Sequence, residues 1–444
     1  MSPTEQGAGL QRSIGIWRAT ALVVGTIIGA SIFVQPSAII EAVPNAGAAI
    51  GVWFGAGLLT LIGALVIAEL SSAWPASGGV YVFLGRAFTP ALGFLWGWAM
   101  FWSMHTGIIA AIAVVFARYA GTFVPLGDTG TKAVAVAAMV LLSAVNYRGV
   151  RHGSVVQTTL TLVKVLALVM IIAVAFALGE PVAAASAAPT EAVTGNGVIT
   201  ALVAGLFAYG GWHMVSYTAG ETIEPTRTIP RALMIGTFTV TVLYVLANTA
   251  YLYVLPVDRV ASSTRIAAEV ADAIFGPVGG RVVSALVMLS ALGAMNGIIM
   301  AGPRVYQAMA ADGLLFKWVA GVHERFATPH RAIAVQAAWA SVLIMTGTYR
   351  SLFTRVVYTE WIFFALLAVA LFTLRRRPDY APRYRAWGYP VLPLLFIVSS
   401  AVIVINQLVR EPREASIGLA IVLAGLPVYH WWAQRRARET HTAV

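Results

Sequence analysis

Long apolar segments recur along the whole chain, and they constrain its fold more than any other feature. A helix that crosses a lipid bilayer needs about 20 mainly apolar residues. Because backbone polar groups in lipid must bond within their own segment, we expect each long apolar segment to be a helix. The sequence therefore predicts an all-α integral membrane protein with twelve transmembrane helices, over approximately residues 14–41, 46–73, 87–117, 133–147, 154–178, 197–219, 232–255, 279–302, 331–347, 354–374, 390–409 and 416–433.

Composition supports this prediction and excludes several classes of protein. Hydrophobic residues make up 59% and charged residues 11% of the 444 residues, against about 45–50% and about 25% in ordinary soluble domains. A soluble enzyme, a coiled coil and a disordered protein are therefore excluded. The chain has no cysteine, which excludes thiolate metal sites and a disulfide-linked accessory subunit. Because HExxH, Walker and nucleophile-elbow motifs are absent, we expect no catalytic residue, metal or cofactor.

The distribution of positive charge predicts the orientation in the membrane. An even number of spans puts both termini on one side. With that side cytoplasmic, 19 of the 29 Lys and Arg residues fall in or beside cytoplasmic loops, nine fall outside, and Lys164 lies within a span. The positive-inside rule then predicts a multi-pass protein of the inner or plasma membrane with both termini cytoplasmic. We interpret the arginine-rich stretches 375–377 and 435–438 as topological anchors, and the net charge of +11 as loop anchoring rather than binding to nucleic acid.

Two glycine-containing segments are unusual for plain spanning helices. They are Gly25-Thr-Ile-Ile-Gly-Ala-Ser-Ile-Phe33 in span 1 and Phe207-Ala-Tyr-Gly-Gly-Trp-His213 in span 6. Glycine destabilises a helix interior by about 1 kcal/mol relative to alanine, and a broken backbone is tolerated in a membrane where it lines a cavity. Close helix packing is the alternative for Gly25 and Gly29. However, interruptions five spans apart, in corresponding positions of two halves, indicate an inverted-repeat transporter.

Such paired breaks predict the chemistry of the ligand. The N-terminus of a half-helix offers unpaired N–H groups and the positive end of a dipole, which suit a carboxylate. The C-terminus of a half-helix offers free carbonyls, which suit an ammonium group. A site with both ends would hold a zwitterion, so we expect an amino acid as the substrate.

Further motifs, taken with these breaks, resemble one superfamily. They are Glu69-Leu-Ser-Ser-Ala-Trp-Pro75-Ala-Ser-Gly78-Gly79-Val-Tyr81, Gly220-Glu221-Thr-Ile-Glu-Pro225-Thr-Arg-Thr-Ile-Pro230, Arg304-Val-Tyr-Gln-Ala-Met-Ala-Ala-Asp312-Gly313 and Arg375-Arg-Arg-Pro-Asp-Tyr-Ala-Pro-Arg-Tyr-Arg-Ala-Trp387-Gly-Tyr389-Pro390. From about residue 12 to 430 the chain resembles the amino acid–polyamine–organocation (APC) superfamily, and within it the L-amino-acid transporter (LAT) family and its bacterial relatives.

The resemblance implies a LeuT-type fold, in which two inverted five-helix repeats (5+5) form one transporter domain over residues 1–444. Helices 1 and 6 would be broken mid-membrane. Repeat one would cover about residues 14–178, repeat two about 197–374, and two peripheral helices about 390–433.

The resemblance also implies a carboxylate site in span 1. The substrate carboxylate would meet the backbone N–H groups of Gly29, Ala30 and Ser31. The family often has Gly-Ser-Gly at these positions. Recognition by the backbone survives the difference in side chains, while the volume of the pocket changes.

By the same resemblance, the substrate ammonium would meet backbone carbonyls near Ile27, Phe207 and Gly210. Phe207 would be the aromatic gate over the bound substrate. His213 follows the second break, and we predict that it lines the pocket and bears on side-chain selectivity, because many members carry Asn there.

Lys164 lies mid-span in Thr161-Leu-Val-Lys-Val-Leu-Ala-Leu168. A charged residue at the bilayer centre costs about 2.5–3.5 kcal/mol even on insertion scales, which favours a functional role over chance. Sodium-independent members of the family carry a Lys here, where sodium-coupled relatives hold an ion. The hypothesis is that the Lys164 ammonium replaces that ion and bridges to the broken part of span 1. A role in proton coupling is also open.

Other polar residues in or near the spans have weaker signals. His105 lies mid-span and is interpreted as a hydrogen-bonded packing histidine more readily than as a ligand. Glu360 begins an apolar run and is interpreted as an interfacial carboxylate more readily than as a functional group. Glu69 and Glu221 lie near internal span ends, where we expect them to pair with loop arginines whose contacts form or break during gating.

The predicted function is sodium-independent secondary transport of neutral L-amino acids by alternating access, as an exchanger or linked to protons. The partners would be the amino acid and the lipid bilayer. One alternative is a transporter of cationic amines, polyamines or cationic amino acids, although few acidic residues lie in the pocket spans to balance a second positive charge. A polytopic membrane enzyme is a more distant alternative.

Overall fold

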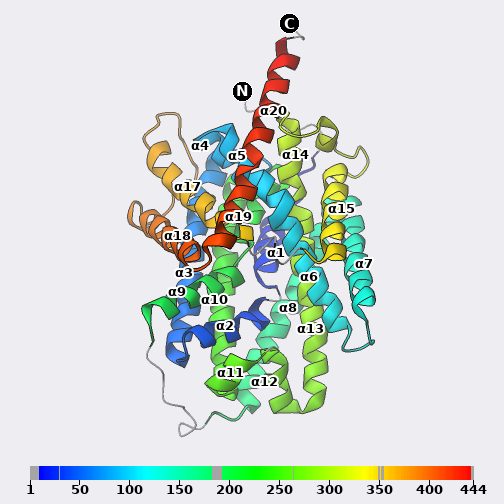
Figure 1. The fold of residues 1–444 in the computed structure, drawn as a ribbon, viewed down its shortest axis with the longest axis vertical. Coiled ribbons are helices and arrows are strands. Elements are labelled where there is room, and N and C mark those ends of the chain that lie inside the picture. The colour runs from blue at the N-terminus through cyan, green and yellow to red at the C-terminus, as the bar shows by residue number, and fades with distance from the viewer. Residues whose placement is uncertain are drawn as a thin grey trace.

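The computed structural model describes residues 10–29, 31–182, 193–263, 265–348, 351 and 355–441 (Figure 1). Within these residues the regular structure is helical, apart from one isolated β-bridge between Ile14 and Thr222. Most long helices run along the long axis of the molecule. The helices α4 and α14 and the end of α20 lie at one end, and α11 and α12 lie at the other (Figure 1). The predicted all-α class is confirmed.

Nine helical stretches of the described residues are long and apolar enough to cross a membrane. They are α3 (Ala46–Ala73), α5 through α6 (Pro90–Ala120), α7 (Asp128–Tyr147), α8 (Val150–Leu178), α9 with the following 3-10 helix η4 (Gly195–Glu221), α10 (Pro225–Val254), α13 with α14 (Val278–Ala311), α18 (Val391–Arg410) and α19 with α20 (Pro412–Arg436). Within the compound stretches the parts are α5 (Pro90–Ala99), the π-helical turn η2 (Met100–Met104), α6 (His105–Ala120), α9 (Gly195–Ala208), η4 (Trp212–Glu221), α13 (Pro277–Ala301), α14 (Pro303–Ala311), α19 (Pro412–Leu423) and α20 (Gly425–His441).

Three other predicted spans coincide with shorter helices. These are α1 (Ile16–Ile27), α15 (His330–Thr346) and α17 (Thr359–Leu374). Further short helices are α4 (Val80–Ala87), α11 (Val257–Ser262), α12 (Ile266–Phe275) and the 3-10 helix η5 (Lys317–Ala320). Several helices begin at local sequence signals. The Asn45 side chain accepts from the Ala48 N–H at the start of α3, and Pro225 occupies the first turn of α10, where a missing N–H is tolerated.

Large apolar side chains cover much of the outer surface of the bundle. Leu141 on α7, Leu162 on α8, Phe238 on α10 and Ile405 on α18 are each more than half exposed. So many exposed large apolar side chains are uncommon on proteins surrounded by water and are typical of a membrane-facing surface. Together with the nine apolar helices, they identify a multi-pass membrane protein.

The first predicted interruption is present at the end of α1. The helix stops at Ile27, and Ile28 has extended backbone with φ −71° and ψ 94°. The chain continues through a single 3-10 turn, η1 (Ser31–Phe33), into α2 (Gln35–Ala42). Ala30 lies outside the described residues.

The second predicted interruption is present at the end of α9. The helix stops at Ala208, a turn follows, and η4 begins at Trp212. Gly211 has φ +95°, in the left-handed region where residues with a Cβ are disfavoured. Glycine therefore allows the chain to turn between the two helical parts at this position.

Candidate functional site

The two interruptions lie against each other. The Thr26 hydroxyl, in the last turn of α1, donates to the Gly211 carbonyl at 3.1 Å. The Tyr244 hydroxyl, on α10, is 3.0 Å from the Ile27 carbonyl and 3.3 Å from the Ala208 carbonyl, so it bridges the two helix ends. These contacts satisfy carbonyls that helix termination leaves without intrahelical partners. They also join segments that are far apart in the sequence into one site.

Lys164 holds the broken end of α1 from the side of α8. Its Nζ donates to the Gly25 carbonyl at 2.6 Å and to the Ile28 carbonyl at 2.5 Å. The side chain is buried, with 3% exposure. Hydrogen bonds from a charged donor are about twice as strong as neutral ones, particularly where water is excluded. The structure thus puts Lys164 on the carbonyls freed by the break, while its part in coupling stays a prediction.

A chain of buried polar side chains continues from Lys164 along α8. Thr161 donates to the Ala21 carbonyl at 3.0 Å, and the Gln157 amide donates to Thr161 at 3.4 Å. The Asn296 amide, on α13, donates to Gln157 at 2.9 Å. These bonds fix the position of α8 relative to α1 and α13, and hence the position of the Lys164 ammonium.

Glycine permits close helix packing in this region. Such packing was the alternative that the sequence offered for Gly25. A Cβ on Gly25 would lie 2.0 Å from Gln157 Nε2 and 2.3 Å from Thr161 Oγ1, which is sterically impossible without movement. At Gly29 the nearest atom to such a Cβ is 3.4 Å away, an ordinary contact. The two glycines therefore differ. Gly25 permits helix packing, and Gly29 belongs to the break.

A cavity of about 300 Å³ lies at the two interruptions. Its lining includes six of the residues predicted to bind substrate, namely Ile27, Gly29, Ser31, Phe207, Gly210 and His213. The seventh, Ala30, lies outside the described residues. Lys164 is not part of the lining and lies behind the first break. The cavity extends between α6, α9, α17 and α18 as far as Gln407, three residues before the end of α18.

Unpaired backbone groups line the cavity at the breaks. Among the described residues, the N–H groups of Gly29 and Ser31 have no hydrogen-bond acceptor, and the Gly210 carbonyl has no donor. The Ile27 carbonyl already accepts from Tyr244, but a carbonyl oxygen can accept a second bond. The site thus presents donors from one broken segment and acceptors from both, the combination that a carboxylate and an ammonium on one carbon atom require.

Sequence comparison places the chain in a family. A profile described as amino acid permease matches residues 14–428. The chain belongs to the amino acid permease family. The permease is 31% identical to the serine/threonine exchanger SteT of Bacillus subtilis over 433 residues, covering 97% of the permease and 98% of the relative.

Two other relatives are transporters of animals. The permease is 31% identical to the large neutral amino acids transporter small subunit 2 of Homo sapiens over 435 residues, covering 95% of the permease and 81% of the relative. It is 28% identical to the Asc-type amino acid transporter 1 of Mus musculus over 432 residues, covering 95% and 81%. The resemblance to APC and LAT transporters is thereby confirmed. The permease is an amino acid transporter and not an enzyme, so the membrane-enzyme alternative is wrong.

Phe207, the predicted gate, lines the cavity of the permease with 40% of its surface exposed. Phe207 thus faces the cavity, and its role as a gate stays a prediction.

The two histidines of the permease occupy different surroundings. His213 lines the cavity, and its ring lies 5.0 Å from Phe364 and 5.6 Å from Trp96, measured between ring centroids. Neither of its ring nitrogens has a hydrogen-bond partner among the described residues. His105 lies off the cavity, and its Nδ1 is 2.9 Å from the Tyr306 hydroxyl. This bond fits the packing role expected for His105.

Glu360 differs from its sequence interpretation. Its side chain lines the cavity together with those of Trp361 and Phe364. The three residues form one face of the first turns of α17. Glu360 thus faces the cavity, which its interpretation from the sequence did not include, while its depth in the membrane stays a prediction.

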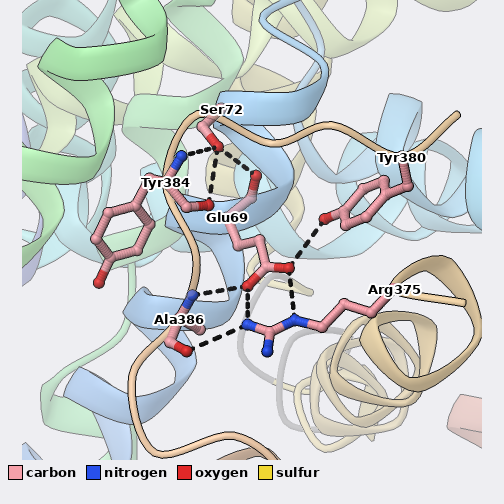
Figure 2. Close-up of polar contacts among 6 residues, drawn as sticks. All are labelled: Glu69, Ser72, Arg375, Tyr380, Tyr384 and Ala386. Atoms are coloured by element: carbon pink, nitrogen blue, oxygen red, sulfur yellow. Dashed lines mark hydrogen bonds and ion pairs between the residues drawn. The ribbon is translucent and has the colours of Figure 1, made fainter. Parts of the chain in front are cut away.

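Away from the cavity, two buried ion pairs join helices of the permease. Figure 2 shows Glu69 on α3, which is fully buried and accepts from Arg375 Nε at 2.9 Å and Nη2 at 2.5 Å. Glu69 also accepts from the Ala386 N–H at 2.7 Å and the Tyr380 hydroxyl at 3.4 Å. The hydrogen-bonded carboxylate raises the pKa of Arg375 above its usual value. Arg375 thus links α17 to α3, rather than serving only as the anchor that its sequence suggested.

A second fully buried pair joins the end of η4 to α14. Glu221 accepts from Arg304 Nε and Nη2, both at 2.8 Å, with 0% and 1% side-chain exposure. In addition, the Tyr81 hydroxyl on α4 donates to Asp312 at 2.6 Å. The predicted pairing of Glu69 and Glu221 with arginines is confirmed. No described residue of η4 beyond Met214 lines the cavity, so these contacts lie outside it.

Proposed function

We propose that the permease is a sodium-independent secondary transporter of neutral L-amino acids that works by alternating access. It would act as an exchanger or couple uptake to protons. The observation that carries this proposal is the cavity at both chain breaks, which presents unpaired N–H groups and an unpaired carbonyl. Relatives named as a serine/threonine exchanger and as large neutral amino acid transporters support the substrate class.

The proposed binding mode uses the backbone for the part common to all amino acids. The carboxylate accepts from the N–H groups of Gly29, Ala30 and Ser31. The ammonium donates to the carbonyls of Ile27, Phe207 and Gly210. Because these are backbone groups, the common part of the substrate is recognised whatever its side chain. Selectivity would then depend on the side chains around the cavity, with His213 among them.

The Lys164 ammonium is proposed to stand where a coupled cation would otherwise bind. It already occupies two of the carbonyls freed at the first break, and a fixed positive charge there would repel a sodium ion. This is the physical basis for sodium independence. Release of the Lys164 proton during the cycle would make transport proton-linked, and a constant charge would leave exchange.

The proposed cycle alternates between two closures. The present arrangement has a cavity on the side of Phe207 and buried ion pairs on the other side. In the cycle, Phe207 closes over the substrate, the Glu69–Arg375 contact separates, and the substrate leaves toward the cytoplasm. Disruption of Glu69 should therefore favour the state open to the cytoplasm.

The proposed architecture follows the LeuT type. One domain over residues 1–444 contains twelve transmembrane helices, in repeats of about residues 14–178 and 197–374 with two peripheral helices at about 390–433. Both termini are cytoplasmic. The breaks in α1 and in the α9–η4 stretch support the repeat, and the excess of Lys and Arg in the proposed internal loops supports the orientation.

Uptake of labelled alanine into proteoliposomes tests the proposal, with vesicles either empty, preloaded with unlabelled amino acids, or under an inward proton gradient. Stimulation only by preloading indicates obligatory exchange, and stimulation of empty vesicles by protons indicates symport. Uptake that requires external sodium would contradict the role given to Lys164. Absence of uptake in every condition would contradict a neutral amino acid substrate and direct the search to cationic amines.

A further inference from the structure

Glu360 is the one acidic side chain that lines the cavity among the residues that the structure describes. No Lys or Arg of these residues lines it, and His213 is the one described residue of the lining that can carry a positive charge. The fully buried carboxylates Glu69 and Glu221 are held by arginines, whereas Glu360 is half-buried. Glu360 therefore needs a separate explanation.

The Glu360 carboxylate has no hydrogen bond or ion pair with any described residue. The nearest arginine on each side of α17 is engaged elsewhere, Arg355 with Glu414 and Arg375 with Glu69. Taking a carboxylate out of water without a partner is costly. A group that enters the cavity with a hydrogen-bond donor would remove this cost.

The position of Glu360 suits contact with a substrate side chain. Glu360 precedes Phe364 by four residues on α17, so the two share a face about 6 Å apart along the helix axis. The Phe364 ring lies 5.0 Å from the ring of His213, which follows the second break. A substrate whose α-carbon groups bind at the breaks would thus extend its side chain along this face toward Glu360.

A simpler role for Glu360 is to stabilise the start of its helix, and this role must be distinguished from contact with a substrate. Glu360 is the second residue of α17 (Thr359–Leu374), where a carboxylate interacts favourably with the helix dipole. This interaction would not require that the carboxylate face a cavity, and it would affect all substrates alike.

We propose that Glu360 is a specificity-determining residue that accepts a hydrogen bond from the end of the substrate side chain. The preferred substrates are then amino acids whose side chain carries a donor, either a hydroxyl or an ammonium group. This inference rests on the proposed function, since it assumes that the α-amino and α-carboxylate groups bind at the breaks. A hydroxyl donor would refine that function within the neutral amino acids, and an ammonium donor would extend it to cationic ones.

Isosteric pairs of competitors test the proposal directly. Inhibition of labelled alanine uptake is measured with threonine against valine, for the hydroxyl, and with ornithine against norleucine, for the ammonium. A hydrogen bond to a charged acceptor corresponds to about ten- to a hundredfold in affinity. We expect wild type to prefer the donor in at least one pair by about tenfold or more. Glu360→Met should bring that ratio close to one, and Glu360→Gln, which keeps an acceptor, should give an intermediate ratio for threonine over valine.

Controls distinguish this inference from the proposed function and from a structural effect. Asp128→Asn removes the first carboxylate of α7, which is exposed and outside the cavity, and should leave both ratios unchanged. Ratios that stay the same in Glu360→Met, or equal weakening of donor and isostere, would overturn the role of Glu360 while leaving amino acid transport intact. Alanine uptake by wild type that shows no preference in either pair would overturn the role of Glu360 alone, whereas absence of alanine uptake would overturn the proposed function. If Glu360→Met does not elute as a folded protein, the Glu360→Gln ratios decide alone.

Discussion

Substitution of Glu69 by Gln tests whether the cluster in Figure 2 keeps one side of the permease closed. The Glu69 carboxylate accepts two bonds from Arg375 and one from the Ala386 N–H. A glutamine amide keeps one acceptor oxygen, and its NH₂ group would face a donor of Arg375 or Ala386. The substitution therefore removes the negative charge and places the amide NH₂ group opposite another hydrogen-bond donor.

The size of the effect follows from the burial of the pair. Glu69 is fully buried and the Arg375 side chain is 14% exposed. Breaking a buried ion pair costs about 3–5 kcal/mol, and we take about 3 kcal/mol because Arg375 keeps some contact with solvent. Since about 1.4 kcal/mol corresponds to a tenfold change in an equilibrium constant, the ratio of closed to open states should fall about a hundredfold. A protein that is about 99% in the closed state would then be about half in the closed state and half in the open state.

Cysteine labelling reports this shift, because the chain has no cysteine of its own. Ser216 on η4 is fully buried, so a Ser216→Cys thiol should react slowly with a membrane-impermeant maleimide from the cytoplasmic side. With Glu69→Gln added, we expect its labelling rate to rise by about fiftyfold, in step with the open population. An Ala111→Cys thiol, which lines the cavity on the other side, should label more slowly from outside.

A matched control removes a carboxylate from an exposed pair. Glu224 lies 3.6 Å from Arg227, and both side chains are more than half exposed. Such pairs contribute about 0–1 kcal/mol, so Glu224→Gln should leave both labelling rates unchanged. If Ser216→Cys labels equally fast with Glu69 and with Gln at that position, in a protein that remains folded, the cluster does not control closure and the reasoning fails.

The remaining predictions concern the breaks. Gly25→Ala should lower the thermal unfolding temperature strongly, since its Cβ would overlap Gln157, whereas Gly29→Ala should lower it little; equal shifts would contradict the distinction between the two glycines. Lys164→Ala should abolish uptake in a protein that still elutes as folded, and uptake at the wild-type rate would refute both the fixed-charge and the proton-carrier roles. His213→Asn should change the order in which amino acids compete for uptake, and an unchanged competition profile would reject its place in the pocket.

The helical framework could be predicted because its signal is local. The thickness of the bilayer sets the length of an apolar segment, and each predicted segment coincides with helix in the structure. Helix ends were less predictable. For example, α10 begins at Pro225 rather than near residue 232, because a turn with Pro at its start extends the helix beyond its apolar part.

The site could be predicted only where its signal is contained in one segment. The glycines and the family motifs pointed to Ile27, Gly29, Phe207 and Gly210, which line the cavity. Tyr244 bridges both helix ends from a segment without any distinctive motif, and its bond to Ile27 spans 217 positions in the sequence. No local pattern identifies such a contact, because it depends on which helices are neighbours.

The depth of a residue in the membrane proved a poor guide to its surroundings. Glu360 lies at the start of an apolar run, which suggested an interface with water and lipid, yet its face of α17 lines the cavity. Arg375 lies in a run of three arginines, which suggested an anchor, yet it is bonded to Glu69 across more than 300 positions. Hydropathy gives the length of a helix but does not tell which neighbour each face meets.

The tether of the Lys164 ammonium to the chain has a consequence for energy conversion. A dissolved cation that binds on one side of a membrane and leaves on the other delivers the free energy of its gradient once per cycle. The Lys164 cation is a covalent part of α8 and is hydrogen-bonded to the end of α1, so it crosses no gradient and performs no net work. A permease built this way can concentrate an amino acid only at the expense of a second solute, either another amino acid leaving the cell or a proton that Lys164 or another group carries across.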